Sequence, residues 1–283
     1  MNTLITTKLL KISWALIGGF AVFLLSGNSA YASNGSSIAT FWKSTGHVQE
    51  SKTWDLSEIE KLKRASSREK DPRSGKMIKW EGVLFSTFLD KVLDGLSVEN
   101  RAQIDLVVVK GANGDRATIP RALITKYPLL LAYRSDHHSE VGNKRGLFSV
   151  VPWTTKPKIR NEDLPLETYF VPSIEQIELT SYRDRYSPFF LKRRTDPSAM
   201  RGEKLFVQNC THCHSGGRPP VLRANQVETT PKKPHTGNSS GAGMAERLTE
   251  KDWKSIVRYL NAYVTENPVS AGGFFSGRST AVK

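Results

Sequence analysis

The stretch FVQNCTHCHSGGRPP, residues 206–220, contains both cysteines of the chain, Cys210 and Cys213. His214 follows the second cysteine directly, and His212 lies between the two. Four kinds of site use such a pattern: a covalent haem, a structural zinc ion, a redox-active dithiol and a disulfide. The fold and the function expected for the C-terminal part of the chain depend on which of them is present.

The spacing C-x-x-C-H is the attachment signature of c-type haem. Two thiols at this spacing can form thioether bonds to the vinyl groups on one edge of the porphyrin. His214 can then place a ring nitrogen on the iron, and a carbonyl of Pro219 or Pro220 could accept the other ring N–H. His212 is expected to point to solvent, because its neighbours already fix the haem edge.

The other three interpretations fit the chain less well. A structural zinc ion needs four ligands, which Cys210, Cys213, His214 and the remote His235 could supply. A redox dithiol is expected near a βαβ pattern, and no strand is predicted before Cys210. A disulfide across two residues would close too short a loop to add much stability. We therefore predict one covalent haem.

Helices are predicted on both sides of this motif. Asp196 can cap a helix that has Pro197 at its first position, runs over residues 197–209 and delivers Cys210 at its end. A second helix is predicted after Thr249, with Asp252 three residues on in a near capping box. Leu248 and Trp253 stand where a hydrophobic staple would close, and an apolar face follows at Trp253, Ile256, Val257 and Leu260.

With these flanks, GEKLFVQNCTHCH and the capped C-terminal helix resemble the class I cytochrome c domain over about residues 198–265. In that family a glycine and a phenylalanine of the first helix pack against the last helix, which are the roles that Gly202, Phe206 and Tyr259 match. The resemblance also implies a methionine as the distal iron ligand. Met244 is the candidate, and His235 is the alternative, which would give a lower reduction potential.

The region before the motif has the pattern of an α+β domain rich in antiparallel strands. MIKWEGVLFSTFLDKVL (residues 77–93) starts as a strand, turns at Gly82 and continues as a helix. Asn113-Gly114 lies between two β-rich runs and predicts a hairpin. A short helix or turn followed by an apolar strand is predicted over residues 122–136, with further strands at 146–153 and 173–182. Residues 181–197 are interpreted as a basic, aromatic connector.

Two weaker patterns precede this region. Leu56, Ile59 and Leu62 repeat at helical spacing. Residues 67–76, SREKDPRSGK, are interpreted as a charged loop.

YPLLLAYRSD, GLFSVVPW and FVPSIEQIELTSY, together with WEGVLFSTFL and DRATIP, resemble the sulfite-oxidase-type molybdopterin-binding domain over about residues 77–180. The resemblance is to short exported members of that superfamily. In the catalytic family a cysteine thiolate binds molybdenum, and this chain has no cysteine before Cys210. The expectation is a domain that keeps the fold without the metal chemistry, so molybdopterin is not expected as a cofactor.

Two polar segments of this domain are candidates for weaker sites. His137 and His138 are adjacent in a polar turn, where exposed loop histidines are the usual case. Lys144 and Arg145 could form a basic face with three further cations, either a solvated surface or a docking patch. The three further cations are Lys156, Lys158 and Arg160.

The N-terminus has the pattern of a secretory signal peptide. Lys8 and Lys11 precede an apolar run over residues 12–25, and Ala30-Tyr31-Ala32 fits a cleavage site after Ala32. The run is shorter than the roughly 20 residues that span a bilayer, although an uncleaved anchor is the alternative. We expect a periplasmic protein with no membrane span in the mature chain. The expected parts are a signal peptide (1–32), an α+β domain (33–182), a linker (183–197) and a cytochrome c domain with a tail (198–283).

The chain of 283 residues has 41 basic and 27 acidic side chains, a formal net charge of +14. Such a charge either serves solubility or favours acidic partners through long-range steering, and export argues against nucleic acid. The sequence thus predicts a mono-haem electron carrier that serves redox partner proteins. A haem-linked molybdopterin oxidoreductase and a haem-based sensor are the alternatives, whereas a single C-x-x-C-H excludes a two-haem peroxidase.

Overall fold

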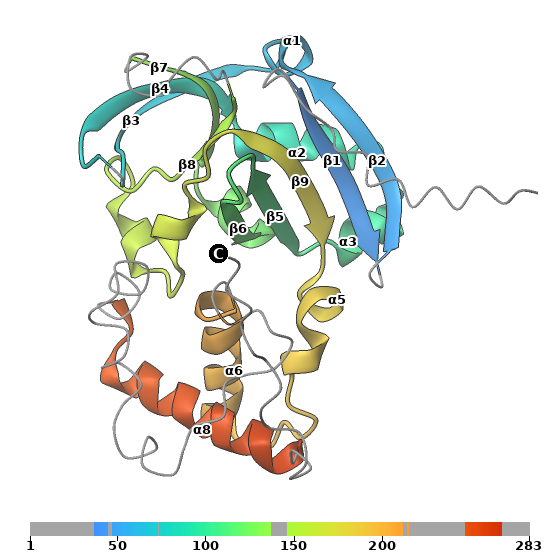
Figure 1. The fold of residues 1–283 in the computed structure, drawn as a ribbon, viewed down its shortest axis with the longest axis vertical. Coiled ribbons are helices and arrows are strands. Elements are labelled where there is room, and N and C mark those ends of the chain that lie inside the picture. Colours follow the sequence, from blue (N-terminus) through green and yellow to red (C-terminus); the bar gives the residue numbers. More distant parts are fainter. Residues whose placement is uncertain are drawn as a thin grey trace, which may run out of the picture. The chain divides into compact units, whose positions relative to one another are not determined.

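The computed structural model describes residues 37–44, 47–72, 74–136, 146–211, 214 and 247–267. Within these ranges two sheets with mostly antiparallel neighbours form the N-terminal part, and helices follow toward the C-terminus (Figure 1). The predicted combination of an antiparallel α+β part and a helical part is confirmed at this level.

The first sheet has five strands in the order β2-β1-β9-β5-β6. Strands β1 and β9 are parallel, and the other neighbours are antiparallel. This arrangement pairs the first described strand with the last strand of the sheet region. The strands are β1 (Ser37–Ser44), β2 (His47–Asp55), β5 (Leu106–Gly111), β6 (Arg116–Pro120) and β9 (Ile174–Thr180).

The second sheet has four antiparallel strands in the order β3-β4-β7-β8. Its strands are β3 (Arg64–Lys70), β4 (Met77–Leu84), β7 (Leu130–Ser135) and β8 (Phe148–Val150). The turn predicted at Gly82 is wrong, because β4 continues to Leu84. Gly82 instead follows a bulge, where an added Cβ would lie 2.1 Å from the carbonyl oxygen of Leu131 on β7.

Among the described residues, helices are interspersed with the strands, and the two longest follow the last strand. The α-helices are α1 (Leu56–Ile59), α2 (Phe85–Leu93), α3 (Val98–Gln103), α4 (Arg121–Lys126), α5 (Tyr182–Tyr186), α6 (Pro197–Asn209) and α8 (Glu250–Glu266). The 3-10 helices are η1 (Pro157–Asn161), η2 (Leu166–Tyr169) and η3 (Ser187–Phe189).

The hairpin predicted at Asn113-Gly114 is confirmed, since β5 and β6 pair antiparallel on either side of it. Gly114 has φ +81°, in the left-handed region that glycine adopts without strain. The strands and the helix predicted over residues 122–182 are also present, as α4, β7, β8 and β9.

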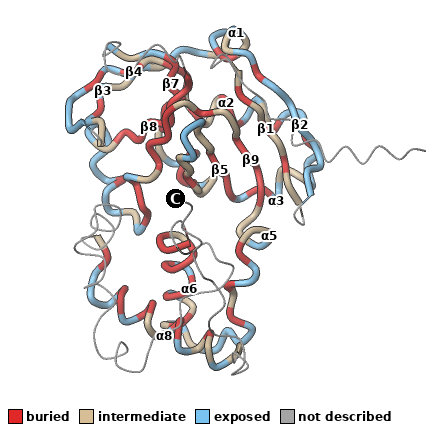
Figure 2. Tube along the Cα trace, in the orientation of Figure 1, coloured by how far each residue is buried: buried red, intermediate tan, exposed pale blue. Residues whose placement is uncertain are grey.

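The region before residue 77 differs from its prediction. The helical spacing of Leu56, Ile59 and Leu62 yields only the four-residue α1, and the segment 67–76 is half strand, because β3 extends to Lys70. Strands β2 and β3 are polar and largely exposed, so they lack the alternation that marks a strand in sequence (Figure 2). Their pairing to β1 and β4 stabilises them instead.

The buried side chains form three clusters. The largest packs α2 against β5, β7 and β9, which are largely buried in Figure 2. A second cluster, around Trp80, Phe148 and Phe170, lies on the four-stranded sheet. The third joins Leu106 at the start of β5 to the aromatic residues of the segment after β9 and to α6 and α8. The segment interpreted as a connector therefore contains α5 and η3 and belongs to a core.

None of the helices in the described ranges combines the length and the apolar character that a membrane span requires.

Candidate functional site

Helix α6 brings the first half of the C-x-x-C-H motif into the fold. It begins as predicted, because Asp196 is the N-cap, its carboxylate accepts the Ser198 N–H at 2.9 Å, and Pro197 is the first residue. It ends at Asn209 with Cys210 as the C-cap, and Cys210 is only 8% exposed. Local capping thus fixes both ends and places the thiol-bearing residue against a packed core.

The backbone keeps a helical hydrogen-bond pattern through the start of the motif. The Cys210 N–H donates to the Phe206 carbonyl at 2.8 Å, and the His214 N–H donates to the Cys210 carbonyl at 2.8 Å. The rings of Phe206 and His214 lie 6.4 Å apart at an interplanar angle of 32°. Cys210 and His214 are therefore one turn apart beside Phe206, as a thiol and an imidazole serving one flat group would need to be.

The other predicted ligands fall outside the described residues. These are Cys213, Met244 and His235, together with His212, the prolines considered as acceptors (Pro219 and Pro220) and the pair His137 and His138. Within the described ranges, no cluster of three or more His, Cys, Asp or Glu side chains is placed to hold a metal ion.

Helix α8 crosses α6 at Gly202. A Cβ added there would lie 1.9 Å from the carbonyl oxygen of Ser255 and 2.8 Å from Cβ of Tyr259, so only glycine allows the two backbones to approach this closely. The ring of Tyr259 lies 5.4 Å from that of Phe206. The predicted close crossing near Tyr259 is confirmed.

The start of α8 is a complete capping box. The Thr249 hydroxyl accepts the Asp252 N–H at 3.3 Å, and the Asp252 carboxylate accepts the Thr249 N–H at 2.9 Å. Asp252 also receives a hydrogen bond from Arg201 on α6. Burial raises the pKa of Asp252, but the hydrogen bonds from Thr249 and Arg201 outweigh it and leave the pKa below its usual range. Leu248 and Trp253, the predicted staple, are both buried in the same core.

The segment between β9 and α6 is held to the two helices by polar contacts. The hydroxyls of Tyr259 and Tyr263 donate to the carbonyls of Phe189 and Pro188 at 2.7 and 2.6 Å. The buried carboxylate of Glu203 accepts the Leu191 N–H at 2.6 Å. These contacts attach the segment between β9 and α6 to both helices.

The C-terminal end of α6 also touches the sheet region. Asn209 donates from Nδ2 to the Asp163 carbonyl at 3.0 Å, and Arg201 lies 3.6 Å from the Asp163 carboxylate. Just before α8, Arg247 pairs through Nη1 with Glu167 of η2. The end of the helix that carries Cys210 is therefore positioned by the segment 163–169. Sequence reasoning missed this contact, since LPLETY carries no motif.

The residues present fit a haem. A buried cysteine and an imidazole lie at the end of a helix, and two buried donors, Tyr169 Oη and Arg247 Nη2, have no acceptor among the described residues. Such atoms are expected where a ligand supplies the acceptor. Cys213, which a covalent haem and a four-ligand zinc ion would both use, lies outside the described ranges, as does His235.

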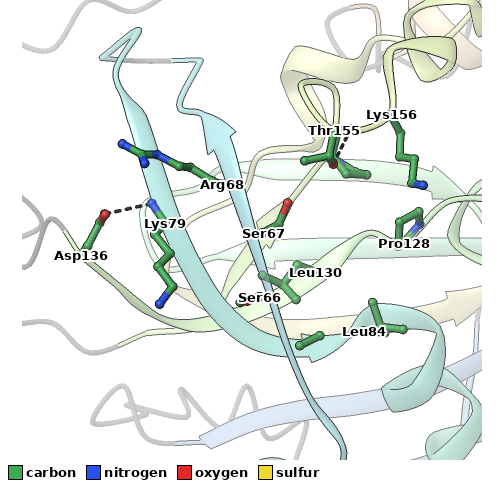
Figure 3. A pocket seen from close by; sticks show the side chains of 12 residues that line it. Ser66, Ser67, Arg68, Lys79, Leu84, Pro128, Leu130, Asp136, Thr155 and Lys156 are labelled. Carbon is green, nitrogen blue, oxygen red and sulfur yellow. Dashed lines mark hydrogen bonds between the residues drawn. The ribbon is translucent and has the colours of Figure 1, made fainter.

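A separate hollow of about 500 Å³ lies on the second sheet, between β3, β4 and the loops at residues 128 and 152–156. In Figure 3 Lys156 and Pro128 stand on one side and Lys79 and Asp136 on the other. Arg68, Lys79 and Lys156 make its lining cationic, and no thiol is present in it. The hollow therefore does not fit the cysteine-ligated molybdenum of the resembled family.

The basic face predicted from sequence is described in part. Lys156, Lys158 and Arg160 are exposed around η1, and Lys144 and Arg145 lie outside the described residues.

The chain matches no model of a known protein family, and no curated protein is similar enough to count as a relative.

Proposed function

We propose that this protein is an exported c-type cytochrome that transfers single electrons between redox partner proteins. Cys210 and Cys213 would hold one haem covalently, with His214 as the proximal iron ligand. Met244 would be the distal ligand, with His235 as the alternative. When bound, the haem iron accepts and returns one electron.

The geometry of α6 carries the proposal. The helix ends at a buried cysteine, presents Phe206 to the His214 ring and crosses α8 at a glycine. The crossing at Gly202 and the packing of Phe206 against Tyr259 of α8 match the roles that the resemblance to class I cytochromes c implies for these residues. This helix pair supports a cytochrome c fold for the C-terminal domain, and the antiparallel sheets support a sulfite-oxidase-like N-terminal domain that acts as a docking or positioning module.

Covalent haem is tested with the full chain made in a host that matures c-type cytochromes. A pyridine-haemochrome assay of the wild-type protein should give about one haem per chain, and the Cys210→Ser/Cys213→Ser double variant should give none. His212→Ala is the matched control within the motif and should retain the haem. A double variant that still shows covalent haem overturns the proposal.

The distal ligand is tested by the optical spectrum of the oxidised protein. Methionine ligation gives a weak sulfur-to-iron charge-transfer band at the red end of the visible spectrum. That band should persist in His235→Ala and vanish in Met244→Ala. The opposite result would assign His235 to the iron, and carbon monoxide binding to the reduced wild-type protein would favour a sensor with an open distal site.

The enzyme alternative, a molybdopterin oxidoreductase with a fused haem, makes a different analytical prediction. Protein from its natural host would then contain stoichiometric molybdenum in addition to iron. We expect iron without molybdenum, because the chain has no thiolate available before Cys210.

A further inference from the structure

Two buried donors lie where the sheet region meets α6 and α8. Tyr169 is 1% exposed, and its hydroxyl has no hydrogen-bond partner among the described residues. The same holds for Nη2 of Arg247. A buried polar atom left without a hydrogen bond is unfavourable, so two such atoms in one cluster point to a ligand that supplies acceptors.

The two donors belong to one cluster. Glu167 and Tyr169 lie on the same short helix, η2, and Arg247 pairs with Glu167 through its other terminal nitrogen. Burial raises the pKa of Tyr169 well above its usual value, and the positive charge of Arg247 acts against that rise. The guanidinium is thus close enough to the phenol for the two to interact.

One chain segment links this cluster to the end of α6, where the C-x-x-C-H motif begins. Asn209, the residue before Cys210, donates to the Asp163 carbonyl at 3.0 Å, six residues before Tyr169. The segment 163–169 therefore extends from the end of α6 to Arg247 at the start of α8. Cys210 would hold a haem by its vinyl edge, so the propionates on the opposite edge would lie away from this cysteine, as the donors of this cluster do in the chain.

The chemistry of the donors restricts the ligand. A phenol and a guanidinium nitrogen both donate, and the guanidinium favours an anionic oxygen acceptor. A haem carries two propionate carboxylates. Resting on the proposed function, we infer that Tyr169 Oη and Arg247 Nη2 donate hydrogen bonds to a haem propionate. The N-terminal domain then completes the haem site and does more than dock a partner.

The inference has a measurable electrostatic consequence. Reduction adds one negative charge to the haem, and a cation held at a propionate stabilises the reduced state. Arg247→Gln removes that cation and should lower the reduction potential. Tyr169→Phe removes only a dipole and should shift the potential in the same direction by less.

The test is a spectroelectrochemical titration of the full-length, haem-loaded protein. For Arg247→Gln we expect the Fe(III)/Fe(II) ratio at a fixed electrode potential to rise about tenfold, which is about 59 mV for one electron. Circular dichroism checks the fold of each variant. Arg247→Lys, which keeps the charge and loses the planar fork, should shift the potential less than Arg247→Gln does, and it supplies the test if Arg247→Gln fails to fold.

Two matched controls separate this site from general effects. Arg258→Gln makes the same charge change at the other end of α6, where Arg258 pairs with Asp196. Tyr133→Phe removes another buried hydroxyl that has no partner among the described residues, on β7. Shifts no larger than in these controls overturn the inference while leaving the haem in place. A wild-type protein without covalent haem overturns the proposed function itself, and the haemochrome assay distinguishes the two failures.

Discussion

The contact between α6 and α8 depends on the absence of one methyl group. Glycine within a helix costs about 1 kcal/mol relative to alanine, so Gly202 is unfavourable for α6 taken alone. The contact with α8 explains why a glycine is present, because the Ser255 carbonyl occupies the space that a Cβ would need. The aromatic pair Phe206 and Tyr259 packs beside this crossing, so the position of the motif depends on the same residue.

Gly202→Ala should therefore destabilise the protein despite its gain in helix propensity. Relief of an overlap at 1.9 Å requires the helices to separate, and overpacking of this kind costs about 1–3 kcal/mol. Urea unfolding followed by circular dichroism measures the loss. Gly95→Ala is the control, since its Cβ would meet only the Val92 carbonyl at an ordinary 3.6 Å. Equal midpoints for the two variants would contradict the role assigned to Gly202.

At the scale of the element, α8 is defined by its first turn. Asp252 accepts hydrogen bonds from Thr249 and Arg201, which depress its pKa below the usual range. A carboxylate with a lowered native pKa adds stability above its unfolded pKa of about 3.9 and loses it as the pH falls through the native value. The capping box should therefore weaken only in acid.

Asp252→Asn should lower the free energy of unfolding at neutral pH, and the difference from wild type should narrow below about pH 4. Thr249→Ala should cost about 1 kcal/mol as a lost N-cap, with a weaker dependence on pH because its hydroxyl does not titrate. Denaturant midpoints across the pH range measure both. If the difference in unfolding free energy between wild type and Asp252→Asn stayed constant into acid, the charge of the carboxylate would not be what stabilises the turn.

The elements that sequence reasoning placed correctly are those with local signals. Helices α6 and α8 have the N-cap residues Asp196 and Thr249, and the β5–β6 hairpin has an Asn-Gly turn. Such signals act over three or four residues and need no knowledge of the rest of the chain.

The elements that were missed depend on partners distant in sequence. Strand β2 buries only Trp54, and β3 buries the carboxylate of Glu69, which accepts hydrogen bonds from Thr154 and Thr155 some 85 residues away. Their sequences lack apolar alternation and read as loops. Tyr169 could not be recognised as a site residue for the same reason. It is distinguished by the contact between its helix, η2, and Arg247, which is distant in sequence.

At the scale of the whole molecule, the sheet region and the helices share a core. Leu106 of β5 packs with α6, α8 and the aromatic residues of the segment between β9 and α6. Under the proposed function, the haem would be attached where these parts meet. Under the same proposal, the N-terminal domain would contribute Tyr169 to the haem site, beside Arg247 of the C-terminal part, which a freely tethered docking module could not do.

The net charge of +14, of which the expected signal peptide carries only Lys8 and Lys11, gives the last prediction, because it should accelerate encounters with anions. Oxidation of the reduced haem protein by anionic ferricyanide should slow at least tenfold as the ionic strength rises from about 0.01 M to about 1 M, over which the Debye length falls from about 30 Å to about 3 Å. Stopped-flow absorbance measures the rate, and a neutral quinone oxidant is the control, whose rate should stay nearly constant. Ferricyanide accepts the electron at the protein surface, so its rate responds to the electrostatic potential at the point where the electron leaves. The salt dependence therefore reports the sign of the charge around that point. A ferricyanide rate that rises with salt would place the electron exit at an acidic patch and would exclude acidic partners at that exit.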